Sequence, residues 1–206
     1  MSTSIHGILA AQDWNSHQWQ ERSTKEDLEN TNFGFEGSDV INATDLNFGH
    51  EQYPADEHGY YFGVLPQFNT KAPDRAKVKD VKIVFLKSKN WQDGETYLVG
   101  FYALPLFVKG SRPLPFEDIA VEADHHMKAL QKDIHLLEQP VSLNDNKHLK
   151  GFVPKGKDLS KQAINFLSRE QVLKIMDEIS LVNTQDNKYK SIKFRMMKAL
   201  GLNLVL

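Results

Sequence analysis

The sequence predicts an α+β fold, in which a compact, mainly antiparallel β unit comes first and helices pack on it. Three observations support this class. Short apolar runs rich in β-branched and aromatic residues fill the first half of the chain. An Asp-Gly pair joins two of these runs in a hairpin. Apolar residues at spacings of three and four recur in the second half, a pattern typical of amphipathic helices.

The β unit is expected to occupy about residues 1–110. The run VKIVFLK, residues 81–87, predicts a central strand because it is rich in β-branched and aromatic side chains. Asp93-Gly94 predicts the turn into the return strand, and Gly100 on that strand marks a bulge or a close backbone approach. The expected strands are 5–11, 59–66, 81–87 and 96–107.

A short helix and a long polar segment lie between the first two strands. Ser23 or Thr24 can cap a helix over STKEDLEN, with Glu26 and Asp27 near its positive N-terminal end. Residues 30–59 are rich in Asn, Gly, Asp and Glu, but their aromatic residues give the segment something to bury. We therefore expect an ordered loop there.

The second part of the chain, about residues 113–206, is expected to be rich in helix. Six apolar residues at spacings of three and four predict an amphipathic helix over 117–137. A capping box from Ser168 to Gln171 opens a second helix. The same kind of spacing predicts a third helix over 188–200.

The seam between the two parts falls at the segment KGSRPLP, which starts at Lys109. A short strand is expected beyond it near Val141. The helices are too few and too short to bury a core of their own, so we expect them to pack on the β unit. Residues 1–206 are therefore expected to form a single α+β domain.

The composition is that of a soluble globular protein, with 40% hydrophobic and 25% charged residues. No stretch approaches the roughly 18 apolar residues that a membrane span needs, and the N-terminus lacks the basic start of a signal peptide. The chain has no cysteine, which excludes disulfides, thiolate metal sites and cysteine nucleophiles. These features favour a cytoplasmic location and no membrane partner.

The net charge of −2 hides an asymmetry along the chain. Residues 1–60 carry 11 acidic and two basic residues, a net of −9, and the remainder carries 16 acidic and 23 basic residues, a net of +7. Such segregation can create a positive face that suits phosphate groups, although charge blocks are often only solvated surface. The candidates for contact with a nucleic-acid backbone are Lys71, Arg75, Lys77, Lys79, Lys87, Lys89, Lys155 and Lys157.

Tryptophans beside small polar residues suggest a site for a flat ligand. Two of them flank the stretch NSHQ near the start of the chain, and the third lies at the expected hairpin turn. Stacking of one base on an aromatic ring contributes roughly 1–3 kcal/mol. Tryptophan is also highly buried on average, so core packing is the alternative for each. The base-pocket candidates are Trp14, Asn15, Ser16, Trp19 and Trp91.

A metal-dependent nuclease is a second interpretation. Asp80 and Lys82 form an Asp-x-Lys triplet before an apolar strand, and Asp56 lies 24 residues earlier. Two carboxylates could hold Mg²⁺ while the lysine polarises the attacking water. Such triplets also arise by chance. His125 and His126 are a separate candidate for a metal site, but as neighbours on the expected helix they would point about 100° apart and could not easily share one ion. No metal site, no cofactor and no catalytic residue is therefore predicted.

Three stretches carry a resemblance to a known superfamily. DWNSHQW near the start, together with the pair VKIVFLKSKNW and TYLVGFYALPLF, resembles the PUA-like superfamily, especially the EVE and YTH-like modules of modification-dependent restriction proteins. The stretch KGKDLSKQAINFLSREQVLKIMDE resembles a segment that recurs in such prokaryotic proteins. The resemblance covers about residues 5–107 and 150–180. It implies a partly open barrel that reads modified bases in DNA or RNA by flipping a nucleotide into an aromatic pocket.

The resemblance also implies roles for individual residues and partners. Trp14, Trp19 and Trp91 would form the pocket walls, and Asn15 and Ser16 would read the base edge. A complete aromatic cage does not align with the sequence. The loop over residues 30–59 is also longer than a minimal module of this superfamily needs. The implied partners are nucleic acid, DNA in preference to RNA, and an effector nuclease or NTPase, separate or fused, in restriction or defence.

The sequence thus predicts a nucleic-acid-binding module that reads a modified or flipped base and has no catalysis of its own. Two alternatives stay open. One is the nuclease that uses Asp56, Asp80 and Lys82. The other is a protein-interaction domain whose acidic first segment meets a basic partner.

Overall fold

The described part of the chain contains two β-sheets and two long C-terminal helices in a computed structural model, so the predicted α+β class is confirmed. The structure describes residues 4–31, 42–49, 53–68, 74–113, 122–144, 149 and 163–202. Within these ranges the sheets do not close into a barrel. No helix in the same ranges is long and apolar enough to span a membrane.

The larger sheet has five strands and a central strand where the sequence predicts one. Its order is β7 (Ile134–Ser142), β4 (Thr96–Ala103), β3 (Ile83–Lys89), β1 (Gly7–Gln12) and β8 (Ile164–Leu167). The β1–β3 pair is parallel, and the other pairs are antiparallel. The expected hairpin joins β3 to β4, and Gly94 in its turn has φ +75°, which favours glycine.

The smaller sheet is antiparallel and lies against the larger one. Its order is β2 (Tyr60–Gly63), β6 (Glu122–Leu130) and β5 (Leu106–Pro113). Met127 and Ala129 of β6 pack with Ile8 and Val84 of the larger sheet in one buried cluster. Strand β5 follows β4 after Leu104 and Pro105, so the expected return strand over 96–107 is divided between the two sheets.

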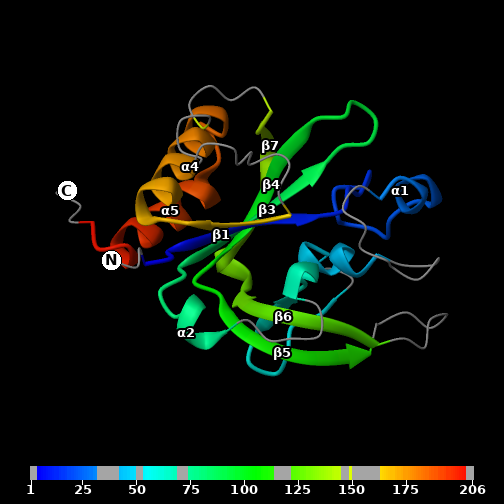
Figure 1. Cartoon of the computed structure of the whole chain (residues 1–206), viewed down its shortest axis with the longest axis horizontal. Coiled ribbons are helices and arrows are strands. Elements are labelled where there is room, and N and C mark those ends of the chain that lie inside the picture. Colours follow the sequence, from blue (N-terminus) through cyan, green and yellow to red (C-terminus); the bar gives the residue numbers. More distant parts are fainter. Residues whose placement is uncertain are drawn as a thin grey trace.

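Two helices cover the opposite face of the larger sheet (Figure 1). They are α4 (Arg169–Val182) and α5 (Asn187–Ala199), which confirms the two helices predicted there. Ile175 of α4 and Ile192 of α5 pack against Phe85 and Phe101 of the sheet. The chain is therefore layered as helices, five-stranded sheet and three-stranded sheet.

The shorter helices lie in the connections. They are α1 (Lys25–Glu29), α2 (Arg75–Val78) and the 3₁₀ turns η1 (Ala43–Asn47), η2 (Pro66–Phe68) and η3 (Gln131–Asp133). Thr24 caps α1 and Ser168 caps α4, each in a complete capping box. Part of the polar segment 30–59 is thus ordered, and the stretch over 32–41 lies outside the described residues.

The helix predicted over 117–137 is wrong. Residues 122–130 and 134–142 are the strands β6 and β7, joined by the turn η3. Ala123, Met127 and Ala129 are buried, a set that is compatible with alternation along a strand as well as with helical spacing. Pairing of β6 with strands on both sides supplies hydrogen bonds that override the local preference.

Candidate nucleic-acid interface

The five base-pocket candidates come together in the structure, and we call this group the tryptophan cluster: Trp14, Asn15, Ser16, Trp19 and Trp91. Four of them lie in the loop after β1, and Trp91 lies in the β3–β4 turn. Two buried carboxylates, Asp27 of α1 and Asp45 of η1, tie these segments together.

Asp27 joins the loop to the hairpin. Its Oδ1 accepts hydrogen bonds from Ser16 Oγ at 2.6 Å and from Trp91 Nε1 at 2.9 Å. Its Oδ2 accepts from the backbone N–H groups of Ser16 and Thr24, each at 3.0 Å. Burial alone would raise the pKa of Asp27, but these hydrogen bonds together lower it below its ordinary value. Asp27 therefore holds Trp91 beside the loop as an ionised acceptor.

Asp45 holds the loop from the other side. Its Oδ1 accepts from Asn15 Nδ2 and from Ser23 Oγ, both at 2.8 Å, and its Oδ2 accepts from the backbone N–H of Ser23 at 2.7 Å. Burial raises the pKa of Asp45 to about 6 despite these bonds, and the charge of Asp27 adds to the shift. The side-chain oxygen of Asn15 accepts from the backbone N–H groups of His17 and Trp19.

Aromatic rings extend the cluster from its half-buried rim into the core. Trp14 and Trp91 are half-buried, whereas Trp19 is 2% exposed. The rings of Trp14 and Trp19 meet edge to face at 5.7 Å between centroids, and Trp14 lies 6.2 Å from Tyr97 of β4. Trp19 in turn meets Phe48 edge to face at 6.0 Å. Trp14 and Trp91 are thus the candidates whose rings a ligand can reach.

Three buried polar groups beneath the rim have no hydrogen-bond partner among the described residues. They are Gln12 Nε2, Ser88 Oγ and Trp19 Nε1. Gln12 and Ser88 are direct partners in the β1–β3 ladder, so their side chains leave the same face of the sheet. That face also carries Ile8 and Ala10, which pack in one cluster with Trp19. Buried polar groups are normally paired, so these three are exceptions to the rule.

The structure changes the roles assigned to two candidates. Both ends of the Asn15 amide are engaged within the protein, and the residue is fully buried. Its role in the structure is to shape the loop. Ser16 is exposed, but its hydroxyl donates to Asp27.

Sequence reasoning missed Gln12, Ser88, Asp27 and Asp45 as parts of the site. A signal existed for the first two, because a polar residue at the end of a buried strand is uncommon. No local signal existed for the carboxylates. Asp27 lies 64 residues from Trp91, and only the fold brings them together.

The raised pKa of Asp45 predicts a pH-dependent stability. Between its unfolded pKa near 4 and its folded pKa of about 6, the folded state binds more protons than the unfolded state. The free energy of unfolding should therefore fall as pH rises through this window, by about 3 kcal/mol in total from this residue and by about 2 kcal/mol between pH 4.5 and 7.5. Urea unfolding of the wild type and of Asp45→Asn gives the free energy of unfolding of each protein at pH 4.5 and at pH 7.5. The difference between the two proteins at pH 4.5, minus the difference at pH 7.5, measures the contribution of Asp45.

The comparison with Asp45→Asn is needed because another group titrates in the same range. Burial lowers the pKa of His135, and this shift makes stability fall as pH falls. Subtracting the variant removes that contribution, which both proteins share. A difference that does not change with pH would contradict the assignment of Asp45.

The basic residues predicted to contact a nucleic-acid backbone differ in how exposed they are in the structure. Arg75, Lys77 and Lys79 are exposed in and after α2, and Lys77 Nζ lies 3.8 Å from the centroid of the Phe166 ring. Lys89 is half-buried at the end of β3. Lys71, Lys155 and Lys157 lie outside the described residues.

The expectation for Lys87 was wrong. Its side chain is fully buried on the helical side of β3, and Nζ donates to Asn165 Oδ1 at 3.4 Å. Side chains alternate between the two faces of a strand. Leu86 and Ser88 therefore face the smaller sheet, and Lys87 between them faces the helices. A buried lysine paired with an amide cannot reach a phosphate at the surface.

The nuclease interpretation gains no support from the described residues. Asp56 lies in the turn before β2, where it accepts from the backbone N–H of Tyr60 and pairs with Lys128 at 3.1 Å. Asp80 and Lys82 lie between α2 and β3. In the part of the chain that the structure describes, no group of three or more His, Asp or Glu side chains could hold a metal ion.

Comparison with protein-family models, with curated proteins and with solved structures finds no match to the chain. The site therefore has to be interpreted from its own chemistry.

Proposed function

We propose that the chain is a nucleic-acid-binding module that reads a modified or flipped base through the tryptophan cluster, without catalysis of its own. One observation carries the proposal. Residues from the β1 loop and the β3–β4 turn converge on Asp27 and Asp45, and two half-buried indoles, Trp14 and Trp91, belong to this group. Indole rings that a ligand can reach suit stacking with a flat ligand.

The chemistry of the cluster fits a base better than an aliphatic ligand. Each base has a π-face that can stack on an indole, whatever its sequence context. Gln12 Nε2 and Trp19 Nε1 are donors, and Ser88 Oγ can both donate and accept. A base inserted here would exchange hydrogen bonds to water for bonds to these groups. These contacts must offset the few kcal/mol that unstacking a base costs.

The resemblance to PUA-like modules agrees with this proposal and extends it. On that analogy the polymer is DNA in preference to RNA, and the module works with an effector nuclease or NTPase in restriction or defence. Titration of the preferred DNA strand beside its RNA counterpart separates the two polymers, and tighter binding of the RNA strand would reverse this preference.

The lysines of α2 provide a second, sequence-independent test. Lys77→Glu and Lys79→Glu should weaken binding of all oligonucleotides alike and reduce the salt slope of the association constant by about 1 for each phosphate that the variant no longer neutralises. Both residues are exposed, so Lys79→Glu should change folding little, whereas Lys77→Glu also loses the contact with the Phe166 ring, which is worth about 0.5–1 kcal/mol. Titration at four salt concentrations gives the slopes, with Lys198→Glu on α5 as the matched charge reversal. Unchanged slopes would place the nucleic-acid face elsewhere.

A binding panel tests the proposal itself. Fluorescein-labelled strands that carry unmodified bases, 5-methylcytosine or N6-methyladenine, single and double, are titrated at low and moderate salt with anisotropy as the readout. Binding of one modified strand that survives moderate salt supports the proposal. The absence of binding even at low salt would overturn it and favour a protein-interaction domain. Cleavage that requires Mg²⁺ and is lost in Asp80→Ala would favour the nuclease.

A further inference from the structure

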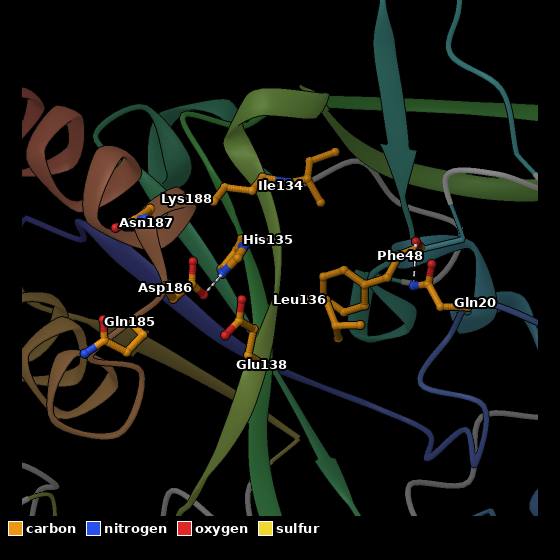
Figure 2. Close-up of a pocket in the computed structure, with 10 residues that line it drawn as sticks. All are labelled: Gln20, Phe48, Ile134, His135, Leu136, Glu138, Gln185, Asp186, Asn187 and Lys188. Carbon is orange, nitrogen blue, oxygen red and sulfur yellow. Dashed lines mark hydrogen bonds and ion pairs between the residues drawn. The ribbon is translucent and has the colours of Figure 1, made fainter.

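A polar cavity of about 500 Å³ lies beside the tryptophan cluster, and we call it the β7 cavity. The cavity lies along the edge strand β7. Gln20 and Phe48 line it on one side of the strand, and the α4–α5 connection lines it on the other (Figure 2). The volume falls within the range of roughly 300–1,000 Å³ that small-molecule sites occupy. Its lining is mixed in character, since carboxylate, amide and ammonium groups stand beside apolar side chains.

The β7 cavity begins where the tryptophan cluster ends. Gln20 directly follows Trp19 in the chain, and its Nε2 donates to the carbonyl of Phe48 at 3.3 Å. Phe48 packs edge to face on Trp19 and also lines the cavity. A ligand held by the cluster and one held in the cavity would therefore lie on either side of the same Trp19–Phe48 contact.

A buried histidine–aspartate pair fixes the far wall of the cavity. His135 is 6% exposed and Asp186 is 2% exposed, and His135 Nε2 lies 2.5 Å from Asp186 Oδ2 (Figure 2). Asp186 Oδ1 accepts from the backbone N–H of Tyr189 and so caps α5. Both oxygens of Asp186 are thus engaged, and the pair locks the first turn of α5 against β7.

The first turn of α5 and the strand present two charged side chains to the cavity. Lys188 has no hydrogen-bond or ion-pair partner among the described residues, and partial burial lowers its pKa although Asp186 opposes the shift. Glu138 is exposed on β7 and can only accept hydrogen bonds when ionised. An ammonium and a carboxylate acceptor that line the same cavity suit a ligand that carries both a phosphate and an amino group.

We propose that the β7 cavity holds the nucleotide next to the base read by the tryptophan cluster. Lys188 contacts its phosphate, and Glu138 accepts from the exocyclic amine of adenine, cytosine or guanine, which thymine lacks. This inference rests on the proposed function, because it assigns a preference for the neighbouring base to the same complex.

The test varies the neighbouring base while the modified base stays fixed. Strands with A, C, G or T on each side of the preferred modified base are titrated by anisotropy against the wild type. We expect thymine on one side, which has no amine, to bind about 3- to 10-fold more weakly than adenine, cytosine or guanine. Glu138→Leu, which has no acceptor, should remove this difference, whereas Lys188→Gln should weaken all four strands by a similar factor. Lys190→Gln, two residues further along α5, is the matched control and should change neither.

The outcomes separate this inference from the proposed function. Tight binding of the modified base with no effect of the neighbouring base would overturn the inference and leave the proposed function standing. A disadvantage of thymine that persists unchanged in Glu138→Leu would overturn it as well. If no strand binds at low salt, the proposed function fails, and the inference fails with it.

Discussion

Replacing Trp91 with alanine is expected to weaken binding of the preferred modified strand by about 5- to 150-fold, the equivalent of one stacking contact of roughly 1–3 kcal/mol. Trp91 is half-buried, and its side chain makes one hydrogen bond, from Nε1 to Asp27. Because the acceptor is ionised, loss of that bond should lower the free energy of unfolding by about 1.5–3 kcal/mol. Anisotropy titration and urea unfolding of the same preparation compare the two effects.

Trp91→Phe is the matched control for this prediction. Phenylalanine keeps a ring for stacking but cannot donate to Asp27. Binding should therefore be largely retained in Trp91→Phe, while stability falls by nearly the same amount as in the alanine variant. Equal affinity of folded Trp91→Ala and wild type, together with a large loss of stability, would mean that Trp91 serves only to pack the hairpin against α1.

Replacing Gly100 with alanine is expected to lower the free energy of unfolding by about 3 kcal/mol. A Cβ on Gly100 would lie against the carbonyl oxygen of His135 and 2.5 Å from Cζ of Phe48. The first neighbour is backbone of the adjacent strand, so relief requires the β4–β7 pair to separate. The register of β4 also shifts at this point, which confirms both roles predicted for Gly100. The midpoint and slope of urea unfolding measure the loss.

Gly59→Ala distinguishes crowding from backbone strain. Gly59 has φ +77° and open space around its Cα, so alanine there should cost only about 1–2 kcal/mol through its left-handed conformation. If Gly100→Ala were as stable as the wild type, the close approach of β4 and Phe48 would be contradicted. Because Phe48 also contacts Trp19, we expect Gly100→Ala to weaken binding of the modified strand too.

Local chemistry was sufficient to predict several elements of the fold. Asp93-Gly94 indicated the hairpin because the turn needs a residue with positive φ, and the Ser168 capping box marked the start of α4. The burial of Ile192, Met196 and Leu200 followed from their spacing on α5.

Non-local pairing explains the elements that the sequence did not reveal. Residues 117–137 have an apolar spacing that suits a helix, yet β6 gains pairing from β2 and β5, which come earlier in the chain. Strand β8 is only four residues long, and it becomes a strand by pairing with β1 about 150 residues away. No local pattern contains this information.

The same division applies to the candidate site. Aromatic and small polar residue types pointed to the tryptophan cluster, because the residues that stack and hydrogen-bond to bases are few. Burial decided the rest. Lys87 seemed a surface lysine in a basic run but lies inside the protein, and Asn15 is occupied by Asp45 and the loop backbone. Whether a polar side chain is free for a ligand depends on its three-dimensional neighbours.

The most direct test of the account is the intrinsic tryptophan fluorescence of the protein during titration with the preferred modified strand at moderate salt. If a base stacks on the rim of the tryptophan cluster, emission should be quenched in the wild type, and the quenching should be markedly smaller in Trp91→Phe, which still binds. Equal quenching in both proteins, or binding without any quenching, would contradict a base site at Trp91.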